Sequence, residues 1–163
     1  MSNDFDALKQ LGARVVRYDQ SLRQKVKVFT KAMEVAPWAM WVKLFKGDHC
    51  VMVYVNRAYG ILYGVDPQAY IGQRDEVFWG KPAAEKFWGH DLLSVKQLGT
   101  PLFAKERIPD LTLPEPMPLE EAPLHNIMKL ALRIEDQIYI YGSAVPEGAE
   151  SAVWELLRKQ ANQ

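Results

Sequence analysis

The chain has 163 residues, of which 48% are hydrophobic and 25% charged, a composition typical of a globular protein that can bury a core. Lysine plus arginine equals aspartate plus glutamate at 20 each, so no net charge draws the chain to nucleic acid or to an anionic membrane. No apolar run reaches about 18 residues, which excludes a predicted membrane span. The single cysteine, Cys50, excludes an internal disulfide and favours a reducing compartment, so we expect a cytoplasmic protein.

Residues 4–35 have the pattern of an amphipathic helix. They contain one glycine and no proline, and their apolar residues recur at spacings of three and four. A subset spaced by seven also suits a coiled-coil seam, namely Leu8, Val15, Leu22 and Phe29. Two interpretations stay open: the helix covers the chain's own sheet, or it pairs with a second copy. Pro37 follows the helix and ends it.

A hairpin and two short helices are predicted next. Residues 39–45 and 50–55 read as strands joined by a tight turn. Asn56 suits the N-cap of a short helix, because its side-chain oxygen can accept a hydrogen bond from a free N–H in the first turn. Gly64 suits the left-handed end of that helix, and Asp66 followed by proline suits the start of another.

The second half predicts one long helix and three more strands. Residues 73–80 read as irregular, and a helix is expected from Lys81-Pro82 to about Leu98. Its apolar positions fall largely on one stripe, made of Ala84, Phe87, Trp88, Leu92, Val95 and Leu98. Residues 101–106 are a strand candidate, and residues 124–134 and 137–145 form a final hairpin. Both faces of that hairpin are fairly apolar, which indicates that both faces of the sheet are covered.

Between these strands, residues 108–123 carry five prolines, which forbid a regular helix or a central strand. We expect an extended excursion that is longer than the usual hairpin loop. A lid, a dimer contact and a tolerated insertion are the open interpretations. A short helix within residues 147–163 completes the chain.

This order of elements resembles the PAS sensor family over residues 38–145. The matching residues are Tyr54, Val55, Asn56, Ala58, Tyr59, Leu62, Gly64, Ile71 and Gly72, then Ala84, Phe87 and Asp91, and then the run 98–102. The resemblance implies an α+β PAS fold, a five-stranded antiparallel sheet with short helices on one face. The expected organisation is an N-terminal helical segment at 1–35, the PAS domain at 36–146 and a C-terminal helix at 147–163.

The resemblance also implies a ligand-binding pocket. The residues at pocket positions are Tyr59, Phe87, Ile127 and Lys129. Lys129 lies on an otherwise apolar strand face, and its ammonium must reach water, a carboxylate or a polar ligand atom because an unpaired buried charge is costly. An aromatic wall with one cationic donor suits a small planar or acidic molecule. The alternative is a sealed core from which Lys129 extends to solvent.

Cofactor and catalytic signals are sparse. Some PAS sensors bind haem through a histidine on the long helix, where His90 lies here, and free flavin is a second alternative; the sequence favours neither. Covalent flavin chemistry needs a cysteine on the helix after the second strand, whereas Cys50 starts that strand. His49-Cys50 has no second His or Cys pair at ligand spacing, so no metal site is predicted. No nucleophile elbow or phosphate loop is present, and we expect no enzyme.

These observations predict a small-molecule-binding PAS sensor of the kind found in bacterial regulatory proteins. It would signal through its terminal helices to a protein partner or to a second copy, with a homodimer formed through the N-terminal helix. No output domain is recognisable, so we expect a stand-alone module. The alternative is a PAS-type dimerisation or interaction module that binds no ligand.

Overall fold

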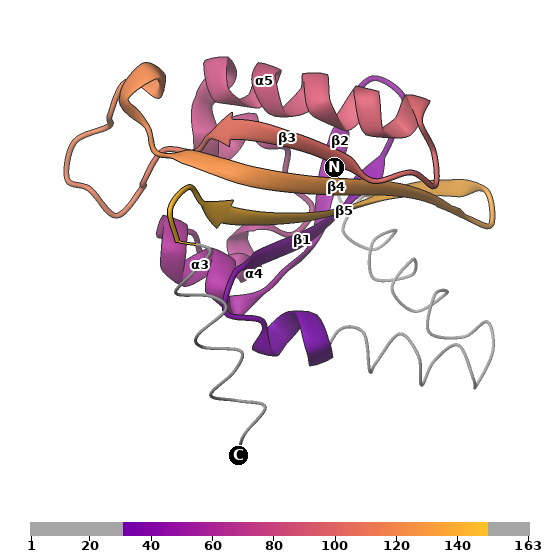
Figure 1. Cartoon of the computed structure of the whole chain (residues 1–163), viewed down its shortest axis with the longest axis horizontal. Coiled ribbons are helices and arrows are strands. Elements are labelled where there is room, and N and C mark those ends of the chain that lie inside the picture. Colours follow the sequence, from indigo (N-terminus) through magenta and orange to yellow (C-terminus); the bar gives the residue numbers. More distant parts are fainter. Residues whose placement is uncertain (1–30, 150–163) are drawn as a thin grey trace.

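The structure is a computed structural model that describes residues 31–149. It contains one five-stranded antiparallel sheet, drawn in Figure 1. The strands are β1 (Ala39–Phe45), β2 (Cys50–Val55), β3 (Leu102–Arg107), β4 (Leu124–Ile134) and β5 (Gln137–Pro146), in the spatial order β2-β1-β5-β4-β3. The predicted PAS-type sheet is confirmed, and the bounds of β1, β2 and β4 agree with the sequence patterns.

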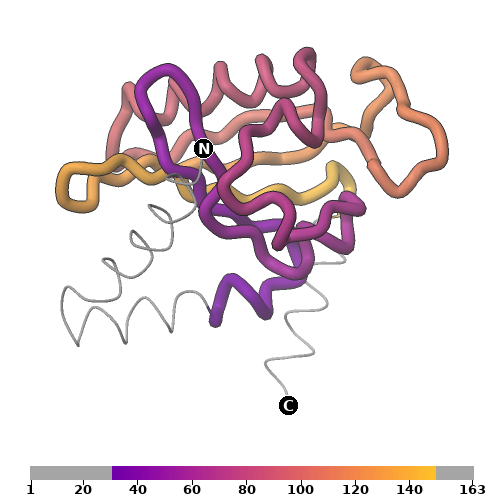
Figure 2. The backbone as a smooth tube through the Cα atoms, turned by 180° about the vertical axis from the view of Figure 1, so that it is seen from behind, coloured from indigo at the N-terminus to yellow at the C-terminus, as the bar shows by residue number. Residues whose placement is uncertain are grey.

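Three helices lie on one face of the sheet, here called the inner face, and Figure 2 shows their path from behind. They are α3 (Arg57–Tyr63), α4 (Pro67–Tyr70) and α5 (Glu76–Lys96). The Asn56 side chain caps α3 by accepting from the Tyr59 N–H at 3.0 Å, and it also accepts from the Met40 N–H. Gly64 ends α3 with a φ of 70°, a conformation that glycine adopts without steric cost.

The long helix differs from its prediction at both its start and its buried face. It begins at Glu76, and Gly80, with a φ of 72°, introduces a kink before Pro82. Residues 73–80 are therefore helical in part, and the expectation of an irregular stretch was wrong there. The side chains that α5 buries are Trp79, Ala83, Phe87, Asp91 and Ser94. A carboxylate thus lies on the inward stripe, while Leu93 and Leu98 are exposed.

The two faces of the sheet have separate apolar clusters. On the outer face, Val42, Leu44 and Tyr139 pack with Met33, which belongs to a helical turn at residues 31–35. The rest of the predicted N-terminal helix and the predicted C-terminal helix lie outside the described residues. In residues 31–149, no helix combines the length and the hydropathy that crossing a membrane requires.

Candidate functional site

An aromatic cluster fills one half of the layer between the inner face and the helices. It consists of Trp41, Tyr59, Tyr63, Tyr70, Trp79 and Phe87. Tyr59 lies at its centre, with its ring centroid 4.9 Å from that of Tyr63 and 5.7 Å from that of Trp41, both in edge-to-face geometry. Such pairs are favourable beyond the area they bury. Ile127, from β4, belongs to the same buried cluster.

Two polar atoms of this cluster have no hydrogen-bond partner among the described residues. They are the indole Nε1 of Trp41 and the hydroxyl oxygen of Tyr63, and these residues are only 4% and 3% exposed. Gly142 on the neighbouring strand makes room for the Trp41 ring, since a Cβ at that position would lie 2.1 Å from Trp41 Cε2. Buried polar groups are nearly always paired, so two orphans in one cluster require an explanation.

A buried ion network fills the other half of the layer. Its centre is Asp91 on α5, whose two carboxylate oxygens accept from Lys43 on β1 at 2.9 Å and from Lys129 on β4 at 2.7 Å. Lys43 also binds Asp75 at 2.5 Å. Lys129 also binds Glu106 on β3 at 2.9 Å. The network therefore ties the long helix to three strands of the sheet.

The ion network continues in both directions. At one end, Nδ1 of the half-exposed His90 lies 2.8 Å from Glu106. At the other end, Asp75 accepts from the Tyr70 hydroxyl at 2.6 Å. The Tyr70 hydroxyl oxygen in turn accepts from the Trp79 indole N–H at 2.9 Å. Because Tyr70 and Trp79 belong to the aromatic cluster, the two halves of the layer share one chain of hydrogen bonds.

The pKa values of four groups in the network are shifted towards their charged forms. Burial alone would raise the pKa of Asp91, but Lys129 and Lys43 outweigh it and hold that pKa below its usual value. Burial likewise acts to raise the pKa of Glu106, and Lys129 reverses the shift. For Lys43 and Lys129, burial acts to lower the pKa, but the neighbouring carboxylates outweigh burial and the pKa of each lysine is raised. Two ammonium groups thus face three carboxylates.

The four predicted ligand residues come together in this layer. Tyr59, Phe87 and Ile127 share the apolar cluster, and Lys129 lies beside it. Lys129 is 1% exposed, so it does not extend to solvent as the alternative interpretation expected. Of the three partners that the sequence allowed for its ammonium, the structure contains carboxylates. The Lys129 ammonium also donates to the Phe87 carbonyl at 3.2 Å, and this bond occupies its third N–H.

Sequence reasoning did not find Lys43, Asp75 or Glu106 as parts of the site. One signal was present, because Lys43 interrupts an apolar strand in the way that Lys129 does. The mutual contacts carried no signal, since Asp91 is 38 residues from Lys129 and 48 from Lys43. His90, considered above as a haem ligand, contacts Glu106 instead.

Two open hollows flank the layer. One, of about 160 Å³, lies where the start of β2 meets the first half of α5, and Asp75, Asp91 and Cys50 contribute to its lining. Burial raises the pKa of the Cys50 thiol to about 12, so this thiol stays protonated at neutral pH. The other hollow, of about 560 Å³, lies over β2, α3 and α4. Within residues 31–149, no group of three or more His, Cys, Asp or Glu side chains is arranged to bind a metal ion.

Solved structures share this fold. A PAS domain from Colwellia psychrerythraea matches 74% of this chain and 95% of its own length at 16% identity, with a TM-score of 0.56. The PAS domain of Bordetella pertussis BvgS matches 85% of this chain and 96% of its own length at 19% identity, with a TM-score of 0.57. An RNA-binding light-oxygen-voltage receptor matches 83% of this chain at 14% identity, with a TM-score of 0.58, over 36% of its own length.

No protein-family model matches the sequence, and no curated protein is detectably similar to it in sequence. The sheet order, the helices on its inner face and the three structural matches agree with one another. The described part of this chain is therefore a PAS-fold domain.

Proposed function

We propose that this PAS-fold domain is a sensor module of a signalling protein that binds a small molecule between the sheet and its helices. Among the proteins with this fold are a PAS domain of a two-component sensor histidine kinase and the PAS domain of BvgS. At identities of 14% and 19% these matches support the fold alone, so the function rests on the site.

The observation that carries the proposal is the pair of orphan polar atoms in the aromatic cluster. Leaving a buried donor unpaired costs about 1–3 kcal/mol. A ligand with an acceptor atom beside Trp41 Nε1 would remove that cost, and the Tyr63 hydroxyl can donate or accept. The surrounding rings of Tyr59 and Phe87 suit a flat apolar body. We therefore propose a small planar molecule that carries at least one hydrogen-bond acceptor.

The predicted site residues divide their roles in this proposal. Tyr59, Phe87 and Ile127 form the apolar wall, and Trp41 and Tyr63 supply the polar contacts. Lys129 would act indirectly, because its ammonium binds the Phe87 backbone carbonyl and so ties that turn of α5 to β4. A ligand with an acidic group beside Lys129 would have to replace Asp91 or Glu106, which makes the acidic alternative the weaker one.

Signalling would follow from a shift in population. A ligand changes the balance between two conformations only if it binds one of them better. Here the ligand would favour one packing of the sheet against the segments at the two ends of the domain. Homodimer formation through residues 1–35, transfer of the signal to a protein partner and a cytoplasmic location belong to the same proposal.

Native mass spectrometry of the full chain purified from its own cells tests ligand binding. We expect a mass above that of the polypeptide, lost on denaturation and lost in the double variant Trp41→Phe/Tyr63→Phe. Tyr139→Phe is the matched control, because Tyr139 packs on the outer face. A wild-type protein without any bound molecule would rule the ligand out. A double variant that folds and retains the molecule would rule out the aromatic cluster as its site.

A specific observation favours a second candidate, an interaction module that needs no ligand. The donors of Lys129 all have protein partners, and the aromatic rings pack against one another. Such an interior is closed by its own side chains. The same mass measurement separates the two candidates, since this one predicts the polypeptide mass alone together with an intact dimer or complex.

A further inference from the structure

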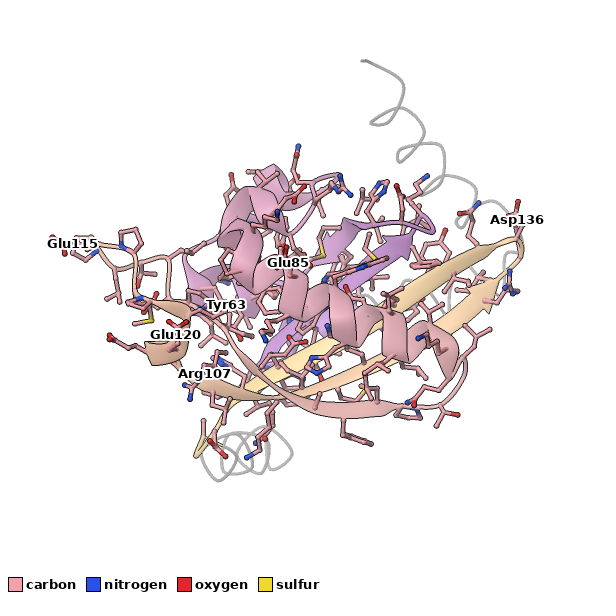
Figure 3. The ribbon with its side chains drawn as sticks, turned by 90° about the horizontal axis from the view of Figure 1, so that it is seen from above. Tyr63, Glu85, Arg107, Glu115, Glu120 and Asp136 are labelled. Atoms are coloured by element: carbon pink, nitrogen blue, oxygen red, sulfur yellow. The ribbon has the colours of Figure 1, made fainter. Side chains whose placement is uncertain are left out.

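Part of the loop at residues 108–123, between β3 and β4, projects from the body of the domain. Figures 1 and 2 show it beyond one end of the sheet, and Figure 3 places Glu115 at its outer end. Residues 111–116 are all exposed, including Leu111 and Leu113. An excursion that offers apolar side chains and prolines to solvent is a candidate recognition element.

The base of this loop is firmly held. Ile108 is 4% exposed and Ala122 is fully buried. The Ile108 N–H donates to the Pro123 carbonyl at 3.1 Å, which closes the loop across its base. Arg107 Nη1 donates to the Ala122 carbonyl at 2.8 Å. The tip is therefore presented from a fixed position.

The loop also contacts the end of α3 that belongs to the aromatic cluster. The Leu111 N–H donates to the Tyr63 carbonyl at 3.1 Å. Gly64 lies so close to the loop that a Cβ there would be 2.7 Å from Thr112 Cγ2. Asp110 accepts hydrogen bonds from the backbone N–H and the hydroxyl of Thr112, which stiffens this contact. A change at Tyr63 would thus reach the loop directly.

Residues 116–118, which precede a 3-10 turn at Leu119–Glu121, are biased by their two prolines towards the polyproline II conformation. Proline fixes φ near −65° at positions 116 and 118, and a residue that precedes proline is pushed towards extended ψ. Glu115 and Met117 both precede proline. Pro118 has φ −58° and ψ 143°, which are polyproline II values. The prolines have no N–H, so this segment suits recognition through its ring surfaces rather than strand pairing.

The loop is also strongly acidic. Residues 108–123 contain four carboxylates and no lysine or arginine, a formal charge of −4; the carboxylates are Asp110, Glu115, Glu120 and Glu121. The whole chain has no net charge, so this charge is a local feature. It complements a basic surface.

We propose that this loop is the docking element for a protein partner with an aromatic-lined polyproline II groove and a basic rim. Preorganisation by proline lowers the entropy lost on binding, which is the usual advantage of such segments. The proposal goes beyond ligand sensing and does not depend on it, because it rests on the loop's own conformation, exposure and charge.

Site-specific photo-crosslinking in the native cells tests the proposal. A photoreactive residue replaces Glu115 in the full chain, and the control replaces Asp136 at the opposite end of the molecule, where Figure 3 labels it. We expect one protein adduct from position 115 and none from position 136. No adduct at 115, the same adduct at both positions, or an adduct with a second copy of this chain would overturn the proposal.

Binding of the purified captured protein to the full chain then decides its mode of recognition. Pro116→Ala/Pro118→Ala should weaken binding of the captured protein at least about tenfold. The Tm of the domain should not change, because both prolines are exposed in the loop. Glu115→Lys/Glu120→Lys should weaken it and reduce its salt dependence, whereas Glu85→Lys/Asp136→Lys makes the same change of net charge elsewhere and should leave binding unchanged. Unchanged binding of both loop variants would refute the assignment.

Discussion

The ion network and the aromatic cluster occupy the same layer but satisfy their polar groups differently. In the network, each ammonium bridges two carboxylates, and Asp91 uses both oxygens. In the aromatic cluster, Trp41 and Tyr63 leave polar atoms without partners among the described residues. An unpaired buried charge costs far more free energy than an unpaired buried hydroxyl or indole N–H, so a folded domain tolerates only the latter. From this comparison we expect the network to lock the fold, and in the proposal above the aromatic cluster is where a ligand would add contacts.

Asp91→Asn should have the largest effect, because it removes the charge that both lysines share. We expect a loss of about 3–5 kcal/mol in the free energy of unfolding, as for other buried pairs that lose one partner. Urea denaturation measures it, with the exposed hairpin-tip variant Asp136→Asn as the control. A loss below about 1 kcal/mol would show that the network does not lock the fold.

Gly142→Ala tests the packing between the two halves. Its new methyl group would overlap the Trp41 ring, where the built Cβ lies 2.1 Å from Cε2, and we expect a cost of about 1–3 kcal/mol. Gly89→Ala is the matched control, because a Cβ there meets no atom within 4 Å and helix propensity favours alanine by about 1 kcal/mol. Equal effects of the two substitutions on thermal unfolding would contradict the described position of Trp41.

The network also predicts how stability depends on pH. The pKa values of Asp91 and Glu106 are lowered in the fold, so their contribution is complete above their ordinary values of 3.8 and 4.5 and is lost as pH falls through the folded values. The pKa values of Lys43 and Lys129 are raised, so their contribution is complete below 10.5 and is lost as pH rises through the folded values. Stability from these groups should therefore be flat between about pH 5 and 10.

Glu106→Gln should reduce the slope of the unfolding free energy against pH on the acid side. The reduction is at most about 1.4 kcal/mol per pH unit, which corresponds to one proton. Urea denaturation repeated between pH 3 and 7 measures the slope, and the exposed Glu85→Gln variant is the control. An acid limb that stays as steep in Glu106→Gln would be inconsistent with an ionised Glu106 in the fold.

Tyr63→Phe should have the smallest effect and the opposite sign. It removes a buried hydroxyl that has no partner among residues 31–149, so the ligand-free domain should gain about 1 kcal/mol. Tyr54→Phe provides the contrast, because the Tyr54 hydroxyl donates to Glu34 at 2.6 Å and its removal should give no gain. If Tyr63→Phe lost stability in ligand-free protein, its hydroxyl would have a partner after all.

Local patterns were sufficient to predict most of the fold. The cap at Asn56, the left-handed Gly64 and the two hairpins depend on neighbouring residues, and the structure contains all of them. The start of α5 was misplaced because Pro82 reads as a first-turn residue. In the structure the chain is helical on both sides of Gly80, which local pattern did not reveal.

The site was less predictable because its contacts join distant parts of the chain. Lys129 stood out as a charge on an apolar strand, and that reasoning correctly required a partner. Asp91 was placed on the long helix, but an apolar stripe assigned by hydrophobicity excluded it from the buried face. Only the register that sets Lys129 opposite Gly142, and Gly142 opposite Trp41, brings both halves of the layer together.

A crystal structure of the full chain isolated from its own cells, at a resolution that shows individual waters, is the most direct test of the central claim. We predict density for a non-protein molecule in the aromatic cluster, with an acceptor atom within hydrogen-bond distance of Trp41 Nε1. Density for side chains alone, with Trp41 Nε1 and the Tyr63 hydroxyl still without a partner, would contradict it.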